Sequence, residues 1–543
     1  MGPRPVLPLR IYRPGERGGW AAVLAATGGT ELREGLTTVT RGTLLVMITT
    51  LSLVAFNFLS RWILVRTNLS AWNSFSYCLA VAGILSSVGA LGLPSAVARG
   101  LPYATTDAER RTIVRTSITV SAVGAAALGL ALWLLAPSLA NALGNPALKV
   151  GLEFFSIVVV TSIGSGLVAA LFQGYSDVLP NALFVQLLNP ALFFAILLVF
   201  LLVPPSRLTY TEALAAFVVA NLVTLGCCVG YAIRQLPRHL PPGPHAPEAR
   251  GRLLRFAAPL FAAAAMLSLA GSGDTLVLGI YRPPTDVGIY TASLTLARLL
   301  SIGISAASFI FLPVATRFLR RDNHRAIQLT YAAVTKWMLL LSLPLFLLFV
   351  VLPSSSLGFV YGPRLASIVM PLELAVAGAF GATVLGPAAT TQIAYGRVRL
   401  LAINSAVAGV TDVGIAFLLV PTYGYVGAAT AWGISTLLYA ALCLIELALL
   451  DGIHPFGRPF VVPLLATSVP IALVLLPIRI LGISVPFWIL PPAAIAVAGA
   501  FVLVVLVTRS LDEGDRLLLG AVEYLIGRPV PFVRRLARWT WGG

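Results

Sequence analysis

Three ionisable side chains lie deep inside long apolar stretches of this sequence: Asp274, Arg298 and Asp412. Such groups are costly in an apolar environment, so they face the interior of a helix bundle or a water-filled path and mark candidate functional sites. A guanidinium stays protonated, and its planar fork of donors matches a phosphate group. The chemistry to look for is therefore the binding of an anion by Arg298 and of a coupling proton or sodium ion by the carboxylates.

Two interpretations of Arg298 are open from the residues alone. A rise of about 1.5 Å per helical residue places Arg298 about 16 Å, and Asp274 about 10 Å, below the outer ends of their helices. Arg298 then either captures a substrate phosphate or forms a structural ion pair with Asp274. Asp274 is accordingly a candidate for ion coupling or for a structural pair. Asp412 is a second candidate for ion coupling, or it hydrogen-bonds a neighbouring helix, as expected for the shallower Glu373.

The composition of the chain shows what surrounds these residues. Of 543 residues, 58% are hydrophobic and 10% are charged, whereas a soluble domain carries about 25% charged residues. Too few polar groups are present to cover a water-exposed surface, so much of the surface must face lipid. The formal net charge of +17 comes almost entirely from arginines in short loops. That distribution is typical of membrane topology and argues against a nucleic-acid partner.

Apolar stretches of about 20 residues, the length that crosses a bilayer as a helix, recur along the chain. Continuous apolarity favours helices over the strands of a membrane barrel, in which apolar residues alternate with polar ones. The predicted fold class is an all-α, polytopic membrane protein with about fourteen transmembrane helices. The stretches begin near residues 42, 72, 113, 151, 183, 211, 254, 287, 327, 367, 400, 424, 460 and 485.

The longest polar interruption, residues 235–253, divides the helices after the sixth. We therefore predict two six-helix lobes plus two C-terminal helices, an organisation found in transporters with duplicated halves. In chain order the predicted parts are a cytoplasmic N-terminal segment (1–40), an N-terminal transmembrane lobe (41–234), a cytoplasmic interlobe linker (235–253), a C-terminal transmembrane lobe (254–450), two additional transmembrane helices (451–508) and a cytoplasmic tail (509–543).

The basic residues also predict the orientation in the membrane. Of the 37 Lys and Arg residues, 29 fall on the same side as the N-terminus, including Lys336 in a predicted inner loop. Seven fall on the opposite side, and Arg298 lies within a helix. Because loops rich in Lys and Arg stay in the cytoplasm, both termini are expected there, in a multi-pass protein of the plasma (inner) membrane.

The motifs of common enzyme classes are missing from the sequence. No Walker A loop, HExxH, GxSxG or CxxC pattern occurs, and the longest loop holds a single acid, Glu248. ATP hydrolysis, metalloprotease, serine hydrolase and dithiol chemistry therefore lack their usual residues. We therefore expect neither an enzyme nor a bound metal or organic cofactor. A coupling proton or sodium ion is the one candidate for a small bound ligand besides the substrate.

Three segments carry a pattern that is found together in one family. The first is GSGDTLVLGIYRPPTDVGIYTASLTLARLL (271–300), followed by FLPVATRFL (311–319). The second is AYGRVRLLAINSAVAGVTDVGIAFLLVPTYGYVGAATAW (394–432), and the third is SSVGALGLPSAVARG (86–100). In order and spacing they resemble the polysaccharide (O-antigen type) flippases of the multidrug/oligosaccharidyl-lipid/polysaccharide exporter superfamily.

The resemblance implies a flippase that moves a polyprenyl-phosphate-linked oligosaccharide across the membrane by alternating access, for the synthesis of a cell-surface polysaccharide or glycan. The candidate substrate-binding residues are Arg298 for the phosphate, Arg41 and Arg99 at inner helix ends for first contact with the pyrophosphate, Arg61 in an outer vestibule, and Asn57 for the sugar. The implied partners are the lipid-linked oligosaccharide, membrane lipids and enzymes of polysaccharide synthesis.

Two other functions compete with this one. A cation-coupled exporter of small molecules, of the multidrug type, would be expected to carry several acids in its cavity, whereas this chain has few deep acids and one deep arginine. A membrane scaffold for a polysaccharide-synthesis complex, with no transport of its own, is the third hypothesis. The arginine favours an anionic substrate and hence the flippase.

Overall fold

The computed structural model describes residues 31–175, 177–202, 208–239, 246–319, 322–481, 486–508, 510 and 514–515. The chain divides into two compact units, residues 1–46 and 47–543. In the first unit the described part is the beginning of helix α2 (Glu31–Thr67). The predicted segment 1–40 and tail 509–543 lie largely outside the described residues. All later elements belong to the second unit.

Every described element is a helix. After α2 come α3 (Leu69–Gly89), α4 (Leu93–Tyr103), α5 (Asp107–Ala142), α6 (Ala147–Gly174), the π-helix η1 (Pro180–Leu188), α7 (Asn189–Leu202) and α8 (Tyr210–His239). Then follow α9 (Pro247–Tyr281), α10 (Pro284–Ala297), the 3₁₀-helix η2 (Arg298–Ser301), α11 (Ile302–Leu319), α12 (His324–Val351) and α13 (Pro353–Tyr361). The chain continues through α14 (Met370–Val384), α15 (Ala388–Ala394), α16 (Val398–Tyr423), α17 (Tyr425–Asp451), α18 (Arg458–Ile480), the 3₁₀-helix η3 (Phe487–Ile489) and α19 (Leu490–Val507).

The helices have the length and composition of membrane spans. Among the described residues, ten are long and apolar enough to cross a bilayer, and two bent pairs raise the number to twelve. Two shorter apolar helices, Arg458–Leu473 and Pro491–Val507, follow at the C-terminal end. The prediction of an all-α, polytopic membrane protein is confirmed, and the spans together with the two C-terminal helices agree with the predicted number.

Local sequence explains where several spans begin. The Thr106 side chain accepts a hydrogen bond from the Glu109 backbone N–H at the start of α5, and Asn323 does the same for Ala326 at the start of α12. Such caps satisfy backbone donors that the first helical turn leaves without a partner. Apolar runs therefore become helices whose ends are set by polar residues.

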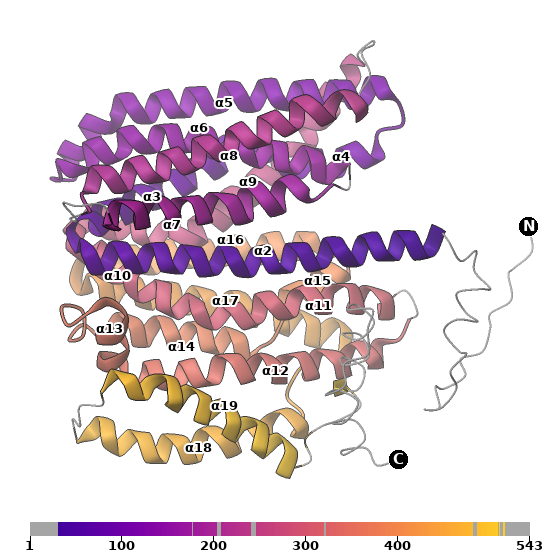
Figure 1. The fold of residues 1–543 in the computed structure, drawn as a ribbon. Helices are drawn as coiled ribbons and strands as arrows, with labels where there is room; N and C mark the ends of the chain where they lie inside the picture. Colours follow the sequence, from indigo (N-terminus) through magenta and orange to yellow (C-terminus); the bar gives the residue numbers. More distant parts are fainter. Residues whose placement is uncertain are drawn as a thin grey trace, which may run out of the picture. The chain divides into compact units, whose positions relative to one another are not determined.

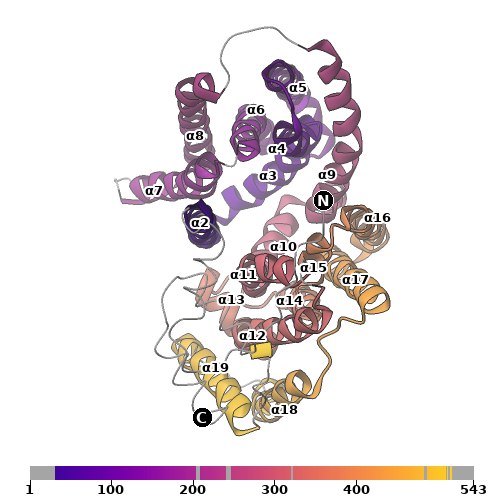
Figure 2. The same ribbon diagram turned by 90° about the vertical axis from the view of Figure 1, so that its right-hand side faces the viewer.

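Within the second unit the helices run side by side along a common direction (Figure 1). Figure 2 shows α3–α8 gathered in one group and α10–α17 in another, with α18 and α19 beside the second group. Helix α9 contacts both groups, through α3, α4 and α5 on one side and α16 and α17 on the other. The division into lobes at residues 235–253 stays a prediction.

Gly92 explains one of the three quoted segments. It lies between α3 and α4 with a φ of +67°, a conformation that glycine adopts without strain. A Cβ atom there would also lie 2.5 Å from the Ala257 carbonyl oxygen of α9. Glycine thus allows the bend and lets α4 pack closely on α9, where Leu93, Val97 and Leu253 are buried.

The position of Lys336 shows that its predicted place in an inner loop was wrong. Its side chain is 1% exposed within α12, not in an inner loop. It forms an ion pair of 2.5 Å with Asp515 and also donates to the Ser510 carbonyl at 2.7 Å, while Trp337 donates to the other Asp515 oxygen. The segment after α19 is therefore bound to α12, and this polar partner is the reason that a lysine can be buried there.

Candidate functional site

Asp274 and Asp412 come together in the structure. Asp274 lies on α9 and Asp412 on α16, and neither side chain is exposed to solvent. The Asp274 backbone N–H donates to Asp412 Oδ2 at 3.3 Å. The two residues that the sequence singled out as candidates for ion coupling are thus neighbours, although 138 residues separate them.

Hydroxyl groups complete what we call the carboxylate cluster: Asp274, Asp412, Thr275, Tyr290 and Ser435. The Tyr290 hydroxyl donates to Asp274 Oδ2, and the Thr275 hydroxyl donates to Asp274 Oδ1 at 3.1 Å. The Ser435 hydroxyl donates to Asp412 Oδ1 at 3.1 Å. Four helices, α9, α10, α16 and α17, therefore supply oxygen atoms to one buried place, and oxygen ligands are those that hard cations prefer.

A glycine allows the two acids to approach each other. Gly273 precedes Asp274 on α9, and a Cβ atom at this position would lie 2.6 Å from a methyl carbon of Val413 and 3.6 Å from Asp412 Oδ2. Helices with a small residue at their contact pack closely, so α9 and α16 can bring their polar groups together. This explains the sequence Gly-Ser-Gly-Asp in the first of the three segments.

Arg298 has a different neighbour from the one that the ion-pair interpretation requires. It lies in the 3₁₀-helix η2, where the span formed by α10 and α11 is interrupted. Its Nη2 donates to the Gly271 carbonyl at 3.0 Å, and its side chain is exposed. No ion pair joins it to Asp274, whose oxygens accept from Tyr290 and Thr275 instead. Arg298 therefore forms no direct ion pair with Asp274, although the two charges lie close enough to interact.

A second arginine approaches Arg298 from another helix. Arg61 on α2 is partly buried, and its Nη1 donates to the Thr295 hydroxyl at 3.2 Å. Thr295 lies one turn before Arg298, and the two guanidinium groups are close enough for their charges to interact. Among the described residues neither forms an ion pair with a carboxylate. We call Arg61 and Arg298 the arginine pair, and such a pair is suited to bind an anion.

The remaining sequence candidates lie in different places. Asn57 is partly buried on α2, one turn before Arg61, and shares its face of the helix. Arg99 on α4 is exposed, and its guanidinium carbon lies 5.2 Å from the centre of the Phe256 ring on α9. It shares no hydrogen bond with the arginine pair. The side chain of Arg41 lies outside the described residues.

Sequence reasoning missed the partners of these groups. Thr275 and Tyr290 stand in the quoted segment 271–300, so their proximity to Asp274 along the chain was a usable signal. Thr295 stands in the same segment, but only the packing of α2 brings Arg61 to it. Ser435 carried no signal, because hydroxyl groups are common in membrane helices and only the packing of α17 brings it to Asp412.

The comparisons with known proteins agree with this architecture. The family model described as polysaccharide biosynthesis protein matches residues 39–319, which is more than half of the chain. The chain belongs to this polysaccharide biosynthesis protein family. The family resemblance inferred from the three segments is thereby confirmed. No curated protein is similar enough in sequence to count as a match.

Solved structures show the same fold. The lipid II flippase MurJ in an inward closed conformation superposes with a TM-score of 0.66 at 12% identity, over 84% of this chain and 98% of that one. An inward-facing multidrug resistance MATE family transporter of the MOP superfamily gives a TM-score of 0.57 at 15% identity, over 76% and 98%. This member of the polysaccharide biosynthesis protein family thus has the fold seen in MOP superfamily structures. The family comes from the sequence match to the polysaccharide biosynthesis protein model, and the solved structures add the fold.

Proposed function

We propose that this protein is a flippase that moves a polyprenyl-phosphate-linked oligosaccharide between the leaflets of the membrane by alternating access. The observation that carries the proposal is the arginine pair, in which Arg61 of α2 and Arg298 next to α10 lie near each other, and neither forms a direct ion pair with a carboxylate among the described residues. Two guanidinium groups can hold a phosphate or pyrophosphate through charge-assisted hydrogen bonds.

The physics of the task fits these groups. The sugar and the phosphate need a polar path through the bilayer, whereas the hydrocarbon tail can stay in the lipid. A charged phosphate in an apolar region needs opposite charge at the depth where it passes, because burial of an unpaired ion is costly. Arginine supplies this charge at every physiological pH. Asn57, on the same face of α2 as Arg61, is the candidate to hydrogen-bond the sugar.

The runner-up is a cation-coupled exporter of small organic cations, and the burial of the acids argues against it. Asp274 and Asp412 are 0% exposed and already bonded to hydroxyl groups, so they do not offer a carboxylate to a drug-sized cation. The exposed charge at the site belongs to Arg298. A scaffold without transport is supported by no contact in the described residues.

A ligand-class experiment separates the two transporters. We expect a short-chain polyprenyl pyrophosphate sugar to raise the melting temperature of the purified full-length protein in detergent, because a ligand that binds the folded state stabilises it. Organic cations such as ethidium should leave the melting temperature unchanged. Stabilisation by ethidium and none by the pyrophosphate lipid would support the exporter instead.

The carboxylate cluster is the proposed site for a coupling ion, a proton or sodium. Asp274→Asn keeps the shape of the side chain but removes the ionisable oxygen, so stimulation of transport by an ion gradient should fall at least about tenfold while the protein stays folded. Transport in proteoliposomes with and without an imposed gradient measures this. Glu373→Gln, an acid of α14 outside the cluster, is the control. An Asp274→Asn protein that is stable and still fully dependent on the gradient would exclude the cluster from coupling.

The proposed location is the plasma (inner) membrane with both termini in the cytoplasm, as the distribution of Lys and Arg indicates. Lipid-linked substrate, membrane lipids and enzymes of polysaccharide synthesis are the proposed partners. A cysteine at Thr285, exposed in the first turn of α10, should react with an impermeant maleimide from outside the cell, and a cysteine at Glu248 should not. The reverse pattern would invert the topology.

A further inference from the structure

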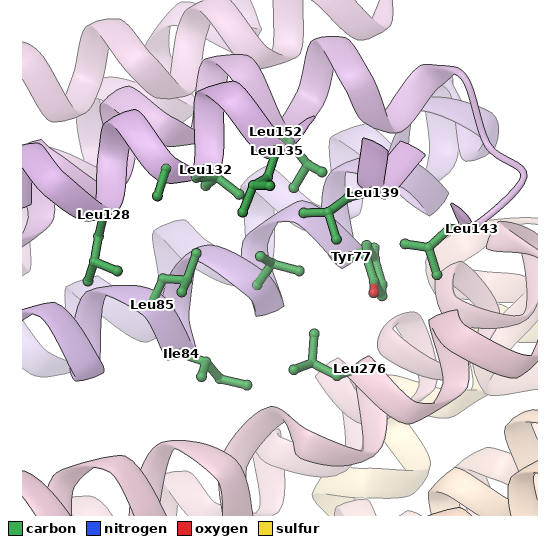
Figure 3. Close-up of a pocket in the computed structure, with 12 residues that line it drawn as sticks. Tyr77, Ile84, Leu85, Leu128, Leu132, Leu135, Leu139, Leu143, Leu152 and Leu276 are labelled. Atoms are coloured by element: carbon green, nitrogen blue, oxygen red, sulfur yellow. The ribbon is translucent and has the colours of Figure 1, made fainter. Parts of the chain in front are cut away.

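A long apolar groove lies where α9 packs against α3 and α5. Its volume is about 360 Å³. Leu128, Leu132, Leu135 and Leu139 line it at helical spacing along α5 and face Leu276 of α9. Figure 3 shows these side chains directed into one common space. The lining continues to residue 143, directly after α5, so at about 1.5 Å per residue the groove runs for about 22 Å.

The lining excludes water as the occupant. Apart from the hydroxyl of Tyr77, the side chains that line the groove are hydrocarbon. A buried water makes two to four hydrogen bonds, and apolar cavities without such partners stay dry. An empty space of this size would deprive its lining of dispersion contacts on one side. An apolar molecule is therefore the occupant that the lining selects.

The position of the groove selects a membrane lipid. Helices α3, α5 and α9 are all spans by length and composition, and Leu135 and Leu139 are 54% and 38% exposed where the groove opens. Hydrocarbon chains are the molecules present at that depth. Acyl chains of phospholipids are the most abundant of these, so a phospholipid is the occupant that this position favours.

One end of the groove is polar. Tyr77 and Leu143 also line a second, smaller hollow, together with Asn145 and Arg282. These residues lie near the same ends of α3, α5 and α9, beside the turns that join the spans. A phospholipid whose chain lies along the leucines would place its glycerol and phosphate near this end, beside Arg282, whose guanidinium also donates to the carbonyls of residues 420–422.

We propose that the groove between α3, α5 and α9 binds one acyl chain of a phospholipid from the surrounding bilayer. None of its lining residues lies on α2 or α10, the helices that bring the arginine pair together, so this site is distinct from the proposed substrate site. Because α9 contacts both groups of helices, a bound chain fills the space beside it and holds α9 against α3 and α5. The inference does not depend on the proposed function.

Photo-crosslinking tests the proposal. The full-length protein is reconstituted in nanodiscs of phosphatidylcholine that include a phosphatidylcholine with a diazirine in the middle of one acyl chain. After irradiation, mass spectrometry should find adducts on Ile84 and Leu276, which line the groove from α3 and α9 and are only partly exposed. Adducts on exposed Leu134 report ordinary contact with the bilayer.

Two variants fill the groove, and one is a matched control. Leu135→Trp and Ala131→Phe add volume inside it and should lower the adducts on Ile84 and Leu276 by about fivefold or more, with those on Leu134 unchanged. Leu134→Trp lies on the same helix with similar exposure but does not line the groove, and it should leave labelling at Ile84 and Leu276 as in the wild type. The proposal is overturned if Ile84 and Leu276 are unlabelled in the wild type, or if both filling variants label them as strongly as the wild type does.

Discussion

Replacing Arg298 by alanine should weaken binding of a polyprenyl pyrophosphate sugar by about 10- to 100-fold, because a hydrogen bond to a charged group contributes about 1.5–3 kcal/mol. The change should leave the fold intact, since the side chain is exposed and its hydrogen bond in the described structure goes to one backbone carbonyl. Arg298→Lys should bind with intermediate affinity, because it keeps the charge and loses the planar fork. Titration of the ligand against the purified protein measures all three affinities.

Arg66 provides a matched control for this experiment. Like Arg298 it is an exposed arginine with a hydrogen bond to a backbone carbonyl, in this case that of Phe359 at 3.2 Å. Arg66→Ala should therefore bind the lipid nearly as well as the wild type does. Because Arg298 forms no ion pair with Asp274, the double change of both residues to alanine should not restore binding. Equal affinities of the wild type and Arg298→Ala would remove this residue from the substrate site.

Replacing Lys336 by methionine should destabilise the protein by about 3–5 kcal/mol, the usual cost of leaving one partner of a buried ion pair unpaired. Lys336 is 1% and Asp515 is 0% exposed, so water cannot replace the lost charge. The remaining carboxylate would keep the hydrogen bond from Trp337 and lose the charge opposite it. A large fall in the melting temperature of the detergent-solubilised protein is the expected result.

The double variant Lys336→Met with Asp515→Leu should recover much of that loss, because two apolar side chains can replace a buried pair at little cost. The exposed pair of Arg110 and Asp107 on α5 serves as the comparison. Arg110→Ala should change the stability by about 0.5 kcal/mol or less, as exposed ion pairs usually do. A Lys336→Met protein with the same melting temperature as the wild type would show that the contact with Asp515 does not stabilise the fold.

The number and positions of the spans could be predicted because a bilayer imposes a length on each apolar run. The breaks within spans could not. The break between α3 and α4 at Gly92 was not predicted, and neither was the 3₁₀ turn in the span around Arg298. Hydropathy reports the depth of a residue in the membrane and carries no information about a change in helix direction.

The candidate site was predictable residue by residue, but its contacts were not. Asp274, Asp412 and Arg298 stood out because each is charged within an apolar run. Their depths left open whether Arg298 would pair with Asp274 or bind a substrate phosphate, because depth does not say which way a side chain points around its helix. In the structure the Asp274 carboxylate accepts from Tyr290 and Thr275, its backbone N–H donates to Asp412, and Arg298 lies near Arg61. Lys336 was predicted in a loop for a related reason. Its buried partner Asp515 lies 179 residues away, so no local pattern indicated that the lysine could be buried within α12.

The most direct test of the central claim is a leaflet-access measurement in proteoliposomes. The purified full-length protein is reconstituted with a fluorescent polyprenyl pyrophosphate oligosaccharide, and a membrane-impermeant quencher or glycosidase reports how much of it reaches the outer leaflet. The account predicts that the wild type exposes the inner-leaflet pool much faster than protein-free liposomes or the Arg298→Ala protein do. The account would be contradicted if the folded wild-type protein moved the lipid no faster than it moves in protein-free liposomes, under every ion gradient tried.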